Sequence, residues 1–152
     1  MVDEAVQIAS IFVDKGTPVY YMVDSGNTET PVFTKTDPID TESPLVVVVN
    51  GYSASASEIL TGCLRDRRDA TLVGKKTYGK GVMQNLFQLT DGSALKLTFA
   101  EYLTPNKTQI NKTGLEPDYE VDLEADSVID PTGEKEVNDT QLNKALEIIK
   151  EK

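Results

Sequence analysis

Three serines occupy alternate positions in the segment "NGYSASASEIL" (residues 50–60), and one of them could act as a nucleophile. The segment joins an apolar run to a pattern typical of a helix, so Ser53, Ser55 and Ser57 lie at a predicted strand-to-helix junction. The first amides of a helix have no intrahelical partner and carry the positive end of its dipole. A serine at such a junction therefore has hydrogen-bond donors beside it for a developing oxyanion.

The composition restricts which base could activate such a serine. The chain contains no histidine, and this excludes Ser-His-Asp and Cys-His mechanisms within it. A structural role for the serines is also open. Ser53 or Ser55 could cap the helix, and Glu58, three residues after Ser55, fits a capping box.

The segment "GKKTYGKGVMQ" (residues 74–84) supplies a candidate base. Lys80 lies between Gly79 and Gly81, and glycines permit close backbone approach and unusual dihedral angles. A lysine amine acts as a base only when neutral, so an ordinary pKa of about 10.4 must fall by roughly three units near pH 7, as burial can cause. Gln84 could orient the amine without adding charge. The structural alternatives are that Lys80 is an ordinary turn lysine and that Gln84 is an amide on a strand surface.

The surrounding pattern predicts an α/β fold that positions these residues. An apolar run at 45–49, a helix at 56–67 and a second apolar run at 70–74 form a predicted βαβ unit, with the first strand buried on both faces. The other expected elements are helices at 2–12 and 138–152, strands at 17–23 and 31–35, a hairpin at 84–103 turning at Asp91-Gly92, and a loop at 104–123 with at most a short terminal strand.

Two patterns predict burial within these elements. Leu95, Leu97 and Phe99 alternate with polar residues, so the second hairpin strand is expected to bury one face. Cys63 follows Ile59 at helical spacing and is expected to be a buried structural thiol.

Length and charge exclude several classes of function. A chain of 152 residues fits one domain, and 25 acidic against 15 basic residues give a net charge of −10, which argues against nucleic acid and anionic membranes as partners. The single cysteine permits no internal disulfide, and without histidine a zinc site is not expected. No EF-hand or Walker-A pattern is present, no apolar run is long enough to span a membrane, and the start is an amphipathic helix, unlike a signal peptide.

Several motifs together resemble the C-terminal processing, or tail-specific, serine proteases. They are "VVVVNGYSASASEILTGCLRDRRDATLVGKKTYGKGVMQ", "LTDGSALKLTFAEYLTPN" and "GLEPDYEV", in the order and spacing of the family, and the resemblance covers about residues 3–122. By position, it implies Ser55 as nucleophile, Lys80 as general base, Gln84 as third polar residue and the Ala56 amide as an oxyanion donor. It implies a ClpP/crotonase-like core, a mixed β-sheet flanked by helices, and endoproteolysis of polypeptides near their C-termini, with no cofactor or metal.

The sequence departs from the family pattern in two places. It has no upstream PDZ domain, and Met1 stands where family members carry a strand and a Gly-Gly turn that gives the second oxyanion donor. We therefore expect a single partial protease core over 1–152 that is poorly active alone. One alternative is a catalytically silent peptide-binding or assembly domain. Another is a crotonase-type acyl-transfer enzyme, which the absence of a recognisable nucleotide-phosphate loop disfavours. The resemblance implies a location outside the cytoplasm or in chloroplasts. Assembly into a homo-oligomer is a further open alternative.

Overall fold

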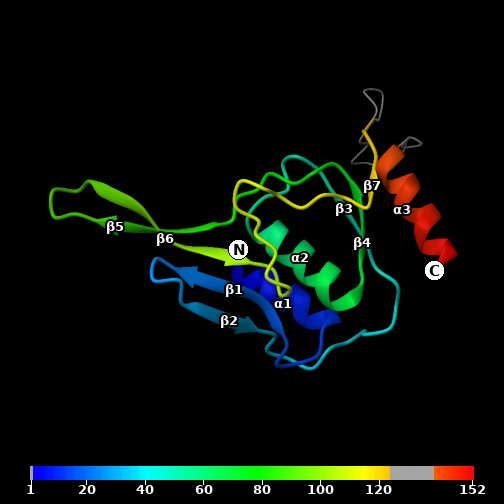
Figure 1. Cartoon of the computed structure of the whole chain (residues 1–152), viewed down its shortest axis with the longest axis horizontal. Coiled ribbons are helices and arrows are strands. Elements are labelled where there is room, and N and C mark those ends of the chain that lie inside the picture. The colour runs from blue at the N-terminus through cyan, green and yellow to red at the C-terminus, as the bar shows by residue number, and fades with distance from the viewer. Residues whose placement is uncertain (1, 124–138) are drawn as a thin grey trace.

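A computed structural model describes residues 2–123 and 139–152, which form two sheets and three helices (Figure 1). The antiparallel sheet has the order β2-β1-β6-β5, and the parallel sheet has the order β3-β4-β7. The elements are α1 (Val2–Phe12), β1 (Pro18–Asp24), β2 (Glu29–Phe33), β3 (Val46–Val49), α2 (Ala56–Arg68), β4 (Thr71–Gly74), β5 (Val82–Gln88), β6 (Ala94–Leu103), β7 (Tyr119–Glu120) and α3 (Thr140–Glu151). The chain is α/β as predicted, but its strands lie in two sheets.

The β3-α2-β4 unit carries the serine segment, and its βαβ arrangement is confirmed. β3 and β4 pair in parallel, from Val46 opposite Thr71 to Val49 opposite Gly74. Two parallel neighbours cannot be joined by a tight hairpin, so the chain must cross back, and α2 makes that crossing. The serine segment therefore lies between the end of β3 and the start of α2.

The core lies where α1 and α2 pack on each other and on β1 and β4. Ala9, Ile59 and Leu72 are almost completely inaccessible to solvent within it. Cys63 is also fully buried, which confirms the predicted structural thiol. Burial of these apolar side chains is the main force that fixes α2, and with it the serine segment, against the rest of the chain.

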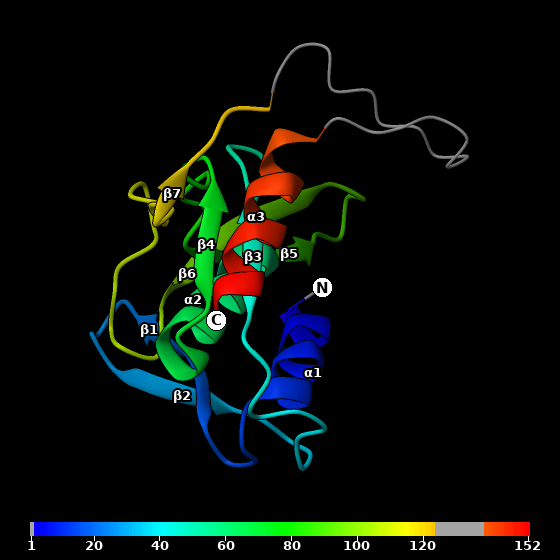
Figure 2. The ribbon, with the colours of Figure 1, turned by 90° about the vertical axis from the view of Figure 1, so that its right-hand side faces the viewer.

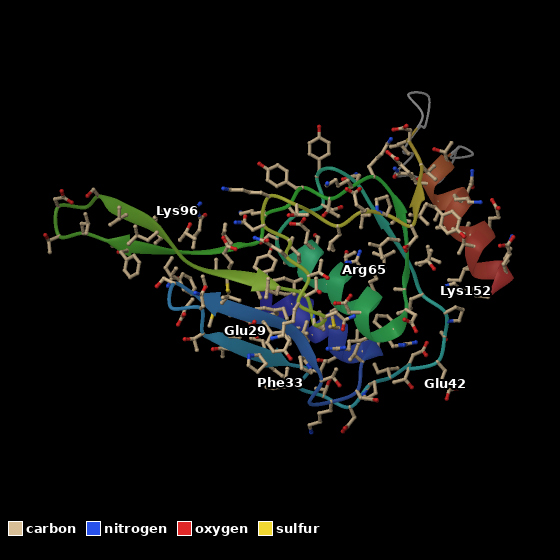
Figure 3. The ribbon with its side chains drawn as sticks, in the orientation of Figure 1. Glu29, Phe33, Glu42, Arg65, Lys96 and Lys152 are labelled. Carbon is tan, nitrogen blue, oxygen red and sulfur yellow. The ribbon has the colours of Figure 1, made fainter. Side chains whose placement is uncertain are left out.

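The β5-β6 hairpin contradicts one prediction, because its apolar residues are exposed. It extends away from the rest of the molecule, and Lys96 lies near the middle of its length (Figures 1 and 3). Leu95, Leu97 and Phe99 are 46%, 45% and 41% exposed, although the alternating pattern predicted a buried face. β1 pairs with β6 only from Ala100 to Leu103, so among the described strands the part of β6 that carries these side chains pairs with β5 alone.

The edge strand β3 contradicts a second prediction. Val49 is buried but Val48 is 44% exposed, so the strand is not buried on both faces. Val48 is left partly uncovered by the described elements, although Val73, its partner on β4, is completely buried.

The closing helix α3 packs against β3 and β4 (Figure 2). The Gln141 side-chain amide donates to the Val121 carbonyl at 2.8 Å, which ties α3 to the segment after β7. The prediction that this helix starts at residue 138 lies outside the described residues. In the described ranges, every helix is too short or too polar to cross a bilayer.

Candidate active site

Ser55 lies immediately before α2, where the backbone takes an unusual conformation. Its φ and ψ are 57° and −116°, and a positive φ is uncommon for a residue with a Cβ. Such a conformation costs roughly 1–3 kcal/mol and persists only where surrounding contacts enforce it. Ser55 is the N-cap residue of α2 and its amide donates to the Glu58 side chain, so the Glu58 half of the capping box expected from the sequence is present. Its side chain also lines a cavity.

The other two serines have different surroundings. The hydroxyl of Ser53 accepts the Asn50 amide at 3.1 Å, and the Ser53 carbonyl accepts the Tyr78 amide at 2.9 Å. Ser53 therefore joins the serine segment to the segment that carries Lys80. Ser57 is exposed on the first turn of α2. Of the three, Ser55 is the one that lines the cavity shared with Lys80.

The glycines beside Lys80 allow the close backbone approach that the sequence suggested. Gly79 has a φ of 84°, a region that disfavours side chains. A Cβ on Gly81 would lie 2.3 Å from the Asn111 amide nitrogen, closer than real Cβ atoms come to any backbone atom. Both glycines are therefore needed for the 79–81 backbone to pack on the loop after β6.

Glu58 joins the two segments, a role that the sequence did not reveal. Its carboxylate is completely buried and accepts the amides of Ser55 at 2.9 Å, Gly79 at 2.7 Å and Lys80 at 2.9 Å. It also accepts the Thr77 hydroxyl at 2.6 Å. One buried acceptor thus holds the backbones of both candidate catalytic residues. The capping-box spacing signalled Glu58, but the contacts to Gly79 and Lys80 are long-range and leave no local pattern.

Ser55, Lys80 and Gln84 line one cavity of about 280 Å³, together with Phe99 and Tyr102 from β6. Ser55 is half-buried, while Lys80 and Gln84 are exposed. The Gln84 amide donates to the Thr98 hydroxyl at 3.1 Å, across the β5-β6 pair. The structure therefore brings the three predicted residues to one cavity, whereas the roles assigned to them stay predictions.

Ala56 is the first residue of α2, as an oxyanion donor on the helix N-terminus requires. At this position its amide has no carbonyl four residues earlier within the helix to bond. Ala56 also lines a neighbouring cavity of about 330 Å³ between α1 and α2, whose apolar lining includes Ile8 and Leu60. The arrangement can therefore place a helix N-terminus beside a serine hydroxyl and a lysine amine.

Comparison with known proteins gives a family for this chain. The model of peptidase family S41 matches residues 1–121. A carboxyl-terminal-processing protease of Synechocystis sp. is 40% identical over 149 residues, which are 98% of this chain and 34% of that protein. The chloroplastic carboxyl-terminal-processing peptidase 2 of Arabidopsis thaliana is 44% identical over 116 residues, which are 76% of this chain and 22% of that protein. The chain thus spans about a third or less of the length of these relatives.

Solved structures agree with this result. The photosystem II D1 C-terminal processing protease superposes with a TM-score of 0.74 at 37% identity, over 80% of this chain and 31% of that one. A lipoprotein from Streptococcus agalactiae superposes with a TM-score of 0.72 over 99% of this chain and 50% of that one, and at 17% identity it supports the fold alone. The chain belongs to peptidase family S41, the C-terminal processing serine proteases.

Proposed function

We propose that this chain is the catalytic core of a serine endopeptidase that uses a Ser55-Lys80 dyad. One observation carries the proposal: the buried Glu58 carboxylate accepts the backbone amides of both Ser55 and Lys80, whose side chains line the same cavity. No histidine is present in the chain to act as base instead. The family relationship supports peptide-bond hydrolysis as the reaction.

The proposed mechanism has two stages. The Ser55 oxygen attacks the peptide carbonyl carbon while the Lys80 amine takes the hydroxyl proton, and the Ala56 amide donates to the developing oxyanion. The C–N bond then breaks, and the protonated Lys80 gives its proton to the leaving amine. Water hydrolyses the resulting acyl-enzyme through the same base. Gln84 serves to orient the Lys80 amine.

We infer that the substrates are polypeptides cleaved near their C-termini, as the names of the relatives say of those proteins. β5 is an edge strand of its sheet, and residues 82–85 line the cavity, so a substrate can add as a strand beside Ser55. Within the α/β class, we infer the ClpP/crotonase-like core that the resemblance implied. A location outside the cytoplasm, such as a plastid, fits relatives that are described as chloroplastic.

Cleavage of an unstructured reporter polypeptide tests the proposal. We expect slow turnover by this chain alone, because Lys80 is exposed and a lysine base needs a dry environment. Turnover should be lost in Ser55→Ala and Lys80→Ala but kept in Lys76→Ala, a matched control in the same loop whose amine pairs with Glu116. A chain extended to the length of the relatives should cleave faster. Cleavage that survives Ser55→Ala would contradict the proposal.

A second candidate is a protease-like domain that binds peptides without cleaving them. The exposure of Lys80 and the bond from Gln84 to Thr98 favour it, since neither side chain is held for base chemistry. Peptide binding without any cleavage, in this chain and in the extended chain alike, would support this candidate over the dyad.

A further inference from the structure

Tyr102 on β6 is a buried polar residue that the proposed mechanism does not use. It is 1% exposed, yet it lines the cavity that contains Ser55 and Lys80. Its hydroxyl donates to the Lys80 carbonyl, and Ser55 lines the same cavity. One phenol therefore bonds the backbone of Lys80 and shares a cavity with Ser55.

The Lys80 backbone is held on both sides by side chains. Glu58 accepts the Lys80 amide at 2.9 Å, and the Tyr102 hydroxyl donates to the Lys80 carbonyl. The backbone amide of Tyr102 also donates to the Gly81 carbonyl at 3.0 Å. With glycines at 79 and 81, the loop has little stiffness of its own, so these bonds set where the Lys80 side chain begins.

The environment of Tyr102 makes it a donor and excludes it as a base. Burial, and then the charge of Glu58, raise the pKa of Tyr102 well above its ordinary value. The phenol therefore stays protonated at neutral pH, with one hydrogen to donate and lone pairs to accept the Ser55 hydroxyl.

We propose that Tyr102 is a positioning residue for Ser55 and Lys80, which fixes the Lys80 backbone through its carbonyl and holds the Ser55 hydroxyl in the cavity. The proposal rests on the proposed function of that pair. It extends that function to the antiparallel sheet, because a residue on β6 then positions Ser55, in the βαβ unit, and Lys80, in the loop after β4.

The test compares Tyr102→Phe with Tyr20→Phe in the whole chain. Tyr102→Phe removes only the hydroxyl and keeps the edge-to-face ring contact with Tyr20, at 6.3 Å between centroids. Tyr20 is 5% exposed and does not line the cavity, so its hydroxyl is a matched control. Two quantities are measured: hydrogen exchange at the Ser55 and Lys80 amides, and the maximal rate and the binding constant for modification of Ser55 by a fluorophosphonate.

We expect Tyr102→Phe to accelerate exchange at both amides about tenfold and to lower the maximal modification rate about fivefold to tenfold, with unchanged probe binding. Tyr20→Phe should change neither quantity. Unchanged exchange in Tyr102→Phe would overturn the proposal, as would faster exchange without a slower modification rate. If the unaltered chain is not modified at all, the dyad itself is wrong. Exchange at the two amides then still decides whether Tyr102 holds this backbone.

Discussion

The positive φ of Ser55 is the clearest local sign that the surrounding contacts impose the conformation of this residue. Glu58 and the first turn of α2 enforce the conformation, since Glu58 accepts the Ser55 amide and the amides of Glu58 and Ile59 bond the Ser55 carbonyl. A nucleophile on a strained strand-to-helix turn presents its hydroxyl away from the helix. Strain of this kind is a cost to stability that the packing of α2 must offset.

This strain predicts opposite effects for two small substitutions. Ser55→Gly relieves the positive φ, whereas Ser55→Ala keeps the strain, and glycine is also preferred over alanine at an N-cap position. We expect the free energy of unfolding of Ser55→Gly to exceed that of Ser55→Ala by about 1–2 kcal/mol. Urea unfolding of the two variants measures this difference in free energy, provided that both unfold with the same m-value. Equal stability of the two variants would show that the backbone is relaxed in solution.

Glu58 predicts a larger effect, because it satisfies several donors at once. In Glu58→Gln, the side chain keeps one accepting oxygen, while its NH2 group can only donate. At least one buried donor therefore loses its partner. We expect a loss of about 2–4 kcal/mol in the free energy of unfolding. Glu42→Gln, on an exposed loop, is the control and should be neutral. A neutral result for Glu58→Gln would mean that water satisfies these amides.

The burial of Cys63 predicts that its thiol reacts slowly in the folded chain. Burial raises the pKa of its thiol to about 12, so the reactive thiolate is scarce at about pH 8 in the folded chain. A thiol reagent should therefore leave the native protein unmodified and react fully in denaturant. Rapid modification of the native chain would contradict the buried position of Cys63 on α2.

At the scale of elements, the βαβ unit could be predicted from the sequence, because its signals are local. Two short β-branched runs flank a helical pattern, and a helix-length segment between parallel strands leaves one simple topology. The turn at Asp91-Gly92 is equally local, and Gly92 takes the positive φ of 85° that such turns require. The burial of the hairpin was predicted wrongly, because alternation shows that one face is apolar and not what covers it.

The exposed hairpin gives a prediction that separates it from the core. Leu97→Thr should change the free energy of unfolding by less than about 0.5 kcal/mol, since Leu97 is 45% exposed. Leu72→Ala should cost about 2–5 kcal/mol, because Leu72 on β4 is completely buried. Thermal and urea unfolding of the two variants provide the comparison. A loss from Leu97→Thr as large as that from Leu72→Ala would show that the hairpin face is covered in solution.

At the scale of the whole molecule, the site assembles three separate parts of the chain. The serine segment and the Lys80 segment could be paired from the sequence, because their motifs have the order and spacing of a known family. Glu58 and Tyr102 could not be assigned in this way. Glu58 looks like an ordinary capping residue, and Tyr102 like an ordinary strand aromatic, until the fold brings their polar atoms to Lys80.

The central claim is that Lys80 activates Ser55, and covalent modification by a fluorophosphonate tests it most directly. Mass spectrometry should locate the adduct on Ser55 of the unaltered chain. Lys80→Ala should slow the reaction at least about 100-fold, the usual contribution of a general base, while Lys76→Ala should react like the unaltered chain. An adduct on another residue, or an undiminished rate in Lys80→Ala, would contradict the account.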